Sequence, residues 1–146
     1  MSEASTTRTD LAEFEQRMLG KGFGILLGAR LDHLEDGFCR LVLPFKPELS
    51  RGDELVHGGV IAALIDKAGT AAAWSYTDIG EGARGATVGL TVNYLIGANS
   101  CDLIAEARVV RRGGSISVID VEVRNPAGEL VAKGPVTYKL SRKKAT

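Results

Sequence analysis

The sequence is poor in the residues that bind metals. It contains two cysteines and two histidines among its 146 residues, and no Cys-x-x-Cys pair. Zinc sites are typically built from clustered cysteines and histidines, so the sequence predicts no metal site. Cys39 falls within one apolar strand pattern, and Cys101 lies just before another. We expect them to be small buried side chains of a protein in a reducing compartment.

The chain also lacks a net charge and a long apolar segment. Its 18 Lys and Arg residues balance 18 Asp and Glu residues, and a neutral protein has no global field that attracts nucleic acid or an anionic membrane. The longest apolar stretch, Val60 to Ile65, is much too short to cross a bilayer. The polar start, MSEASTTRTD, has no apolar core of a secretory signal. We therefore expect a cytoplasmic protein without nucleic acid or membrane among its partners.

Length and composition indicate one globular domain. Apolar residues make up 45% of the chain and charged residues 25%, which is ordinary for a globular protein. We expect residues 1–8 to form a disordered tail and residues 9–146 to form the single domain. A short helix is expected at the start of that domain, with Thr9 or Asp10 as its N-cap.

Residues 58–76 are the only long helical candidate. Apolar side chains cover most of its helical wheel, and a helix that is apolar all round must be surrounded by other elements. The rest of the chain predicts strands, mostly joined by short turns. One buried helix inside an antiparallel sheet of about six strands is an α+β layout called the hotdog fold. The expected strands are residues 23–31, 38–43, 86–94, 103–109, 116–123 and 130–140.

Two of these strands have an irregular pattern. In the 116–123 strand, the apolar residues change parity between Val118 and Val121. This change predicts a β-bulge near Ile119. Pro135 lies within the last strand and cannot donate a ladder hydrogen bond, so we expect an edge or a bulge there. Residues 45–56 are rich in charge and turn residues, and we expect a loop.

Asp66 places a carboxylate in the middle of the apolar helix. Burying a charge costs several kcal/mol unless it is paired, and Lys67 points about 100° away on the wheel. Small neighbours leave room for a second backbone or for a ligand. The pattern therefore favours a functional role for Asp66 over a structural one. Its wheel neighbours are Gly59, Ala62, Ala63, Gly69, Thr70 and Ala73.

The start of the helix is a second candidate site. Gly58 and Gly59 expose backbone N–H groups at the positive end of the helix dipole, without side chains to block approach. This arrangement suits a carbonyl oxygen on which negative charge develops, although a Gly-Gly pair also serves a tight turn. His57 precedes the glycines, and we favour a supporting hydrogen bond over a general-base role.

The spacing of these features predicts an oligomer. Gly58 and Asp66 are eight residues apart, which is about 12 Å along a helix. Catalytic contacts need about 3 Å, so one carbonyl cannot touch both. Two antiparallel helices across a two-fold axis would create two equivalent sites, and the 87–94 strand is suited to pairing with its symmetry mate. We expect a homodimer with shared active sites, assembled into a homotetramer as a dimer of dimers.

Three segments carry a resemblance to a known family. VHGGVIAALIDKAGTAAA, followed by ATVGLTVNYL and AEARVVRRGG, resembles the PaaI-like hotdog thioesterases of phenylacetate and related acyl-CoA metabolism. The likeness covers roughly residues 20–141. It implies an acyl-CoA thioesterase that hydrolyses a small or medium acyl- or aryl-CoA thioester to the free acid and CoA. Coenzyme A is then part of the substrate, and no separate cofactor is expected.

The resemblance also assigns roles to residues. In that family the first glycine after the histidine binds the thioester carbonyl, which implies Gly58. The acid nine residues after the histidine is the base or nucleophile from the facing subunit, which implies Asp66. A hydroxyl one turn later positions water in some members, as Thr70 would here. Arg51 stands where the family usually has Asn or Gln, and we expect it to polarise the carbonyl or to contact CoA.

Further residues are candidates for holding the substrate. Relatives often have Arg-Pro where this chain has Ile96-Gly97, and a basic residue where it has Gly114, so its CoA contacts are expected to differ. Trp74 and Tyr94 are candidates for lining the acyl pocket, or belong only to the core. Basic residues at strand ends and near the C-terminus would bind the CoA phosphates, unless they are only solvated. These are Arg111, Arg112, Lys139, Arg142, Lys143 and Lys144.

Two other functions fit the same fold. A non-catalytic hotdog protein would bind acyl-CoA without hydrolysing it, a hypothesis that Arg51 favours and Asp66 opposes. A hotdog dehydratase or hydratase needs a histidine paired with an acid in another local pattern. The sequence has neither Asp-x-x-x-x-His nor a segment like HFPGxP, so this alternative is disfavoured.

Overall fold

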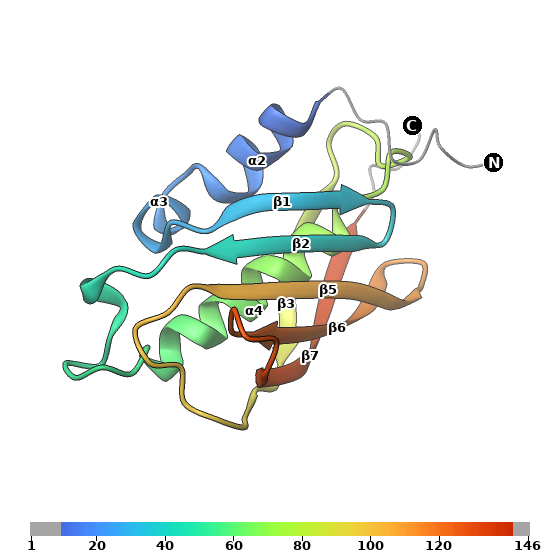
Figure 1. The fold of residues 1–146 in the computed structure, drawn as a ribbon. Coiled ribbons are helices and arrows are strands. Elements are labelled where there is room, and N and C mark those ends of the chain that lie inside the picture. Colours follow the sequence, from blue (N-terminus) through green and yellow to red (C-terminus); the bar gives the residue numbers. More distant parts are fainter. Residues whose placement is uncertain (1–9, 142–146) are drawn as a thin grey trace.

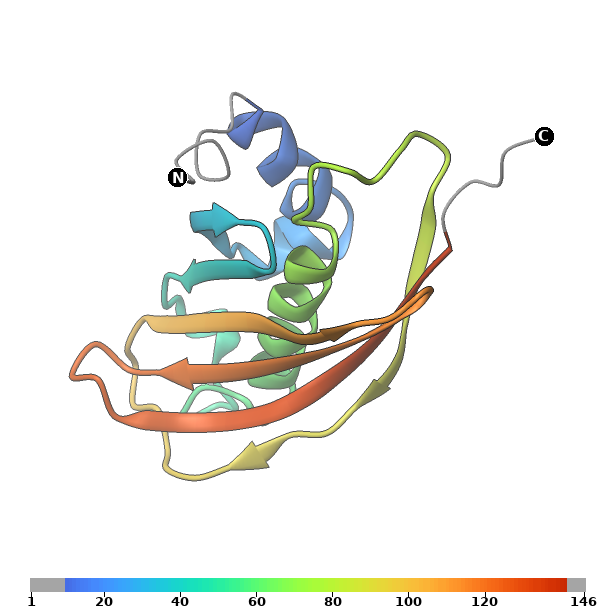
Figure 2. The ribbon, with the colours of Figure 1, turned by 90° about the vertical axis from the view of Figure 1, so that its right-hand side faces the viewer.

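The computed structural model describes residues 10–141, in which an antiparallel sheet wraps around one long helix (Figures 1 and 2). The helices are α2 (Leu11–Leu19), α3 (Phe23–Leu27) and α4 (Gly58–Ala73), with a 3-10 turn η1 (Pro47–Leu49). The strands are β1 (Arg30–Glu35), β2 (Phe38–Leu43), β3 (Arg84–Leu90), β4 (Asn93–Tyr94), β5 (Leu103–Arg112), β6 (Ile116–Arg124) and β7 (Leu130–Ser141). This is the hotdog fold that the sequence predicts. The expected tail at residues 1–8 lies outside the described residues.

The sheet places β3 at one of its edges. Among the described residues it has seven strands in the order β1-β2-β5-β6-β7-β3, and the two-residue β4 also pairs with β7. The expected 86–94 strand is thus divided into β3 and β4, which explains one strand more than the sequence indicates. Between them, the Thr91 N–H donates to the Pro135 carbonyl oxygen at 3.2 Å. Pro135 therefore lies on the interior strand β7, beside the gap between β3 and β4, and not at an edge of the sheet.

Helix α4 lies against the concave face of the sheet, as Figure 2 shows. Leu64, Ile65 and Ala68 are completely buried between the helix and the strands. The helix approaches β7 so closely that a Cβ on Gly69 would lie 2.8 Å from the Cβ of Val136. The expected helix ends three residues early, where the Ser75 hydroxyl donates to the Ala72 carbonyl oxygen at 2.7 Å. Within residues 10–141, no helix is long and apolar enough to span a membrane.

The expected strand at residues 23–31 is wrong except at its last two residues. Residues 23–27 form the short helix α3, and the strand begins only at Arg30. Gly22 and Gly28 have φ values of 52° and 85°, a backbone region that favours glycine. The chain therefore reverses at both ends of a five-residue apolar segment. A short apolar run by itself does not distinguish a helix from a strand.

The bulge expected near Ile119 lies on the neighbouring strand instead. In β6 the odd-numbered residues Ser117 to Val123 are all buried, so its alternation is unbroken. The register with β6 shifts between Val109 and Arg111 of β5. Ile116 and Val118 only look out of phase because they face away from the core, and Ile116 is 40% exposed.

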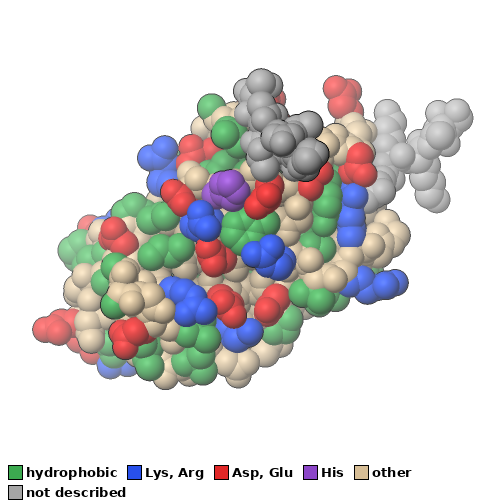
Figure 3. All heavy atoms as spheres, turned by 45° about the vertical axis from the view of Figure 1, so that its right-hand side comes forward, with side chains coloured by type: hydrophobic (Ala, Val, Ile, Leu, Met, Phe, Trp, Pro, Cys, Tyr) green, Lys and Arg blue, Asp and Glu red, His purple; other side chains and the backbone are tan. Residues whose placement is uncertain are grey.

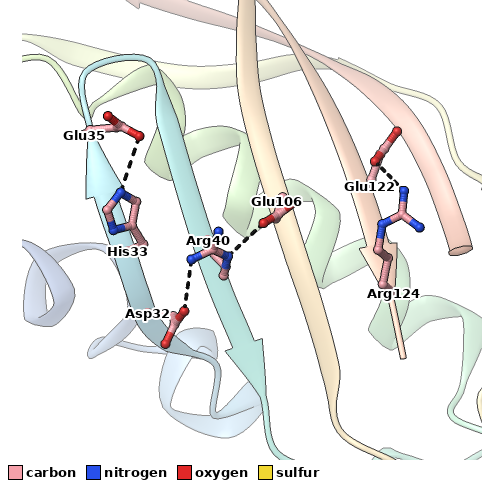
Figure 4. Close-up of polar contacts among 7 residues, drawn as sticks. All are labelled: Asp32, His33, Glu35, Arg40, Glu106, Glu122 and Arg124. Atoms are coloured by element: carbon pink, nitrogen blue, oxygen red, sulfur yellow. Dashed lines mark hydrogen bonds and ion pairs between the residues drawn. The ribbon is translucent and has the colours of Figure 1, made fainter. Parts of the chain in front are cut away.

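The outer face of the sheet is charged. Arg40 donates to Glu106 at 2.8 Å and to Asp32 at 3.4 Å, and Arg124 donates to Glu122 at 3.0 Å (Figure 4). Figure 3 shows acidic and basic side chains interspersed on this side of the molecule. Such exposed pairs add little stability. They keep this face hydrated, so the apolar core forms on the side of α4.

Candidate functional site

The first peptide group of α4 is held at both ends. His57 is the N-cap, and its Nδ1 accepts a hydrogen bond from the Gly59 N–H at 2.8 Å. The carbonyl oxygen of Gly58 accepts from the Tyr94 hydroxyl at 2.7 Å. Both groups belong to the peptide that joins the two glycines. This capping bond agrees with the supporting role expected for His57.

The N–H of Gly58 is the free donor at this helix start. Among residues 10–141 it has no hydrogen-bond partner, and the helix dipole places partial positive charge there. Gly58 lines an open cavity of about 430 Å³, together with Arg51, Gly59 and Tyr94. The structure therefore brings together three of the predicted site residues, Arg51, Gly58 and Gly59. The remaining wall is largely apolar and includes Leu55, Leu95 and Ile96.

Arg51 lines this cavity, and its side chain is paired with Asp53. Its Nε donates to both carboxylate oxygens, at 3.1 Å and 3.0 Å. Asp53 also accepts from the Leu55 N–H at 2.9 Å. That backbone hydrogen bond, together with the Arg51 guanidinium, lowers the pKa of Asp53. Asp53 therefore stays ionised and holds one edge of the guanidinium.

Asp66 lies half-buried in the middle of α4. The hydroxyl of Thr87 donates to its Oδ1 at 2.7 Å. The sequence predicts an acid with only small neighbours on its own helix, and the structure adds a donor from the edge strand β3. Sequence reasoning missed Thr87 because the partner is 21 residues away. Its only signal is the alternation of the 86–94 strand, which does not say what each residue faces.

A second cavity, of about 820 Å³, opens beyond Asp66 toward the end of α4. Thr70, Trp74 and Tyr138 contribute to its lining. The Trp74 indole N–H donates to the Tyr138 hydroxyl at 2.7 Å. Burial raises the pKa of Tyr138, and the negative charge of Asp66 adds to this effect. The two candidate acyl-pocket residues, Trp74 and Tyr94, thus line two different cavities.

The two halves of the predicted site do not meet within one chain. Gly58 and Asp66 lie on the uninterrupted helix α4, which separates them by about 12 Å. A thioester carbonyl bound at Gly58 is therefore out of reach of Asp66 of the same chain. A site in which both groups act on one carbonyl would therefore need Gly58 from one chain and Asp66 from another.

Of the basic residues expected to bind CoA phosphates, the three that the structure describes, Arg111, Arg112 and Lys139, line neither cavity. Arg111 and Lys139 are exposed. Arg112 donates to Asp78 at 2.7 Å, and its guanidinium lies 3.7 Å from the centre of the Tyr76 ring. Arg112 is thus already engaged within the chain. Arg142, Lys143 and Lys144 lie outside the described residues.

Comparisons with known proteins agree with this architecture. Residues 54–132 match the family model described as "Thioesterase superfamily". The chain is 40% identical over 104 residues to a Halobacterium salinarum protein named "Putative esterase VNG_1336C", which covers 69% of this chain and 68% of the relative. It is 28% identical over 129 residues to "Medium/long-chain acyl-CoA thioesterase YigI" of Salmonella typhimurium, covering 80% and 83%.

Solved structures have the same fold over almost the whole chain. A thioesterase family protein from Silicibacter pomeroyi has a TM-score of 0.81 and 26% identity, and the match covers 91% of this chain and 99% of that one. Thioesterase HI1161 from Haemophilus influenzae has a TM-score of 0.83 at 19% identity, covering 94% of each chain. The family match contains the start of α4, Asp66 and Thr87. On this evidence the chain belongs to the thioesterase superfamily.

Proposed function

We propose that the protein is an acyl-CoA thioesterase of the PaaI-like type. Its substrate would be a small or medium acyl- or aryl-CoA thioester, which it hydrolyses to the free acid and CoA. The observation that carries this proposal is the Asp66 carboxylate, half-buried in the central helix and oriented by Thr87 at 2.7 Å. A structural acid would not need a helix face of small residues beside it.

Each half-site performs one part of the hydrolysis. The thioester oxygen accepts a hydrogen bond from the Gly58 N–H, where the helix dipole stabilises the negative charge that develops on it. Asp66 takes a proton from water, whose oxygen then attacks the carbonyl carbon. The carbon–sulfur bond breaks and CoA leaves as its thiolate. In the alternative route Asp66 attacks the carbon directly and water opens the resulting anhydride. In both routes Thr70, one helical turn beyond Asp66, would help position the water.

The proposal includes a homodimer, because Gly58 and Asp66 of one chain do not reach the same carbonyl. Support comes from β3, which lies at a sheet edge and offers unpaired backbone groups. Several large apolar side chains near this edge are exposed, among them Val88 at 57% and Leu95 at 51%. Pairing of two β3 strands about a two-fold axis would cover them. Gly58 of one subunit would then face Asp66 of the other.

A panel of acyl-CoA thioesters, assayed by release of free thiol, tests the proposal. We expect turnover of some short, medium or aryl esters by the wild-type protein. Asp66→Asn keeps the size of the side chain, and we expect it to abolish turnover while CoA esters still bind. Absence of hydrolysis across the whole panel would contradict the proposal. If CoA esters nevertheless bound, the non-catalytic acyl-CoA-binding function would replace it.

A further inference from the structure

The cavity of about 820 Å³ at the end of α4 continues the proposed site past Asp66. Thr70 and Trp74 line it from about one and two helical turns beyond Asp66. The segment that runs from the end of α4 to the start of β3 forms another wall, to which Ile79 belongs (Figure 2). Tyr138 lines the cavity from β7. An acyl group attached to a carbonyl beside Asp66 has room to extend into this space.

The Tyr138 hydroxyl is a buried donor without an acceptor. The residue is only 4% exposed, and its phenol oxygen accepts the Trp74 indole N–H at 2.7 Å. Among residues 10–141, no group accepts the O–H proton of Tyr138 itself. Burial raises the pKa of Tyr138, so the proton stays on the oxygen at neutral pH. Buried polar groups normally have a partner, and here the cavity is where one can bind.

Gly85 leaves the space that this hydroxyl occupies. A Cβ on Gly85 of β3 would collide with the Tyr138 hydroxyl oxygen, so a side chain does not fit beside it. Two residues further along the same strand, Thr87 holds Asp66. Two residues of a strand span about 7 Å. The free donor thus lies several carbon–carbon bonds away from the carboxylate at which the thioester carbonyl reacts.

The charged side chains of the lining favour an uncharged acyl group. Two cations, Arg17 and Lys67, line the cavity together with two acids, Asp10 and Glu81. Lys67 also donates to the Met18 carbonyl oxygen at 3.2 Å. Because the signs balance, the lining offers no net attraction for an ionised carboxylate.

We propose that Tyr138 is a specificity-determining residue, which donates a hydrogen bond to an uncharged oxygen on the acyl group, several carbons from the thioester. This inference rests on the proposed function and narrows its substrate class to oxygenated acyl groups, such as oxoacyl chains. Trp74 is a positioning residue, because its indole N–H binds the phenol oxygen and leaves the O–H for the ligand. A site built to hydrogen-bond a substrate rejects an analogue that leaves its buried polar group unpaired.

A matched pair of substrates tests the inference by kinetics. 5-Oxohexanoyl-CoA has a keto oxygen several carbons from the thioester, and hexanoyl-CoA lacks it. We expect the wild-type protein to prefer the oxo ester roughly tenfold in kcat/KM, and Tyr138→Phe to reduce this ratio to about one. Trp74→Phe removes the indole N–H and should reduce the ratio less, because the phenol keeps its O–H but loses its orientation.

Two controls define what the hydroxyl recognises. Tyr76 lines the same cavity, but its hydroxyl lies beside Gly37 of the β1–β2 turn, where a Cβ would be 2.9 Å from it. Tyr76→Phe should therefore keep the wild-type ratio. Glutaryl-CoA has a carboxylate at the position of the keto oxygen, and it should not be preferred over hexanoyl-CoA. Equal ratios in the wild-type protein and Tyr138→Phe, or a preference for the carboxylate, would overturn the inference.

Binding of inert thioethers separates this inference from the proposed function. S-(5-Oxohexyl)-CoA and S-hexyl-CoA both lack the thioester carbonyl. We expect the wild-type protein to bind the oxo compound roughly tenfold more tightly, and Tyr138→Phe to bind both alike.

The outcomes of the two tests are distinct. If the protein hydrolysed no thioester but still distinguished the thioethers through Tyr138, the thioesterase function would fail and the inference would hold. If the protein were an active thioesterase that bound both thioethers alike, only the inference would fail. Circular dichroism of each variant shows that it is folded before either comparison.

Discussion

Thr87 of the edge strand β3 donates a hydrogen bond to Asp66 of the central helix at 2.7 Å. The bond fixes Oδ1 and leaves Oδ2 without a partner from this chain's described residues. A strand at the sheet edge thus orients the carboxylate on which the proposed chemistry depends. A hydrogen bond to a charged group contributes about 1.5–3 kcal/mol.

Loss of this hydrogen bond should slow the reaction. We expect Thr87→Val, which keeps the branched shape, to lower kcat roughly 10- to 100-fold, because the carboxylate loses its orientation. Thr87→Ser retains the hydroxyl and should recover most of the activity. Steady-state kinetics of both variants check this. Equal loss in the two variants would mean that the methyl group matters and the hydrogen bond does not.

Proline at residue 58 should remove one donor without disturbing the helix. Gly58 is the first helical residue, where proline is well tolerated. His57 has φ −63° and ψ 136°, which is the extended conformation that a following proline requires. We expect Gly58→Pro to lower kcat roughly 100-fold or more at unchanged thermal stability. Gly58→Ala keeps the N–H and brings a Cβ only to 3.4 Å from Tyr94, so it should remain active.

Mixing two inactive variants should restore activity if the sites are shared. In a heterodimer of Gly58→Pro and Asp66→Asn, one of the two sites has both functional groups and the other has neither. Random exchange of equal amounts should therefore give about a quarter of the wild-type activity. Subunits are exchanged under mild denaturation and assayed by thiol release. No recovery, despite proven exchange, would place both residues of a site on one chain.

A side chain at residue 69 should destabilise the fold. A Cβ there would lie 2.8 Å from the Cβ of Val136, so α4 and β7 would have to separate. We expect Gly69→Ala to reduce the free energy of unfolding by about 1–3 kcal/mol, measured by urea denaturation. Val136→Gly removes this Cβ and both Cγ atoms, and so leaves room for the new methyl group. The double variant should therefore be more stable than the sum of the single effects predicts.

Cys39 should be inert in the folded protein. It is completely buried, and this burial raises the pKa of its thiol from 9.0 to about 12. Very little reactive thiolate forms at pH 8, so an aromatic disulfide reagent should label Cys39 only after unfolding. Cys101→Ser isolates this thiol for the measurement. Above about pH 9 the unfolded chain ionises Cys39 while the folded chain does not, which lowers stability as the pH rises. Rapid labelling of native Cys101→Ser would contradict the prediction.

The sequence predicted the central helix and its acid well because both depend on local pattern. Residues 58–73 are apolar all round, and Asp66 interrupts them on a face of small residues. The N-cap of His57 is likewise local, since its partner is two residues away. These features need no knowledge of how distant elements pack.

Two of the errors concern features that depend on distant elements, whereas the third, at helix α3, has a local cause. Thr87 contacts Asp66 only because β3 lies beside α4, and no pattern within either element specifies this contact. The bulge belongs to β5, although it was inferred from the pattern of β6, because strand register is a property of the pair. Helix α3 is set by the two positive φ values of its flanking glycines, which hydrophobic periodicity does not reveal.

The short pairing of β4 with β7 links the C-terminal strand to the start of α4, because Tyr94 of β4 is hydrogen-bonded to Gly58. Tyr94 pairs with Ala132, two residues before Gly134, and a Cβ on Gly134 would collide with the Thr91 carbonyl oxygen. A side chain there would push residues 91–94 outward and lift the Tyr94 hydroxyl from Gly58. A substitution at residue 134 would thus change the position of Gly58 in the proposed oxyanion site, although residue 134 does not line that site. Evolution or design could adjust the activity from there without changing any residue that the substrate contacts.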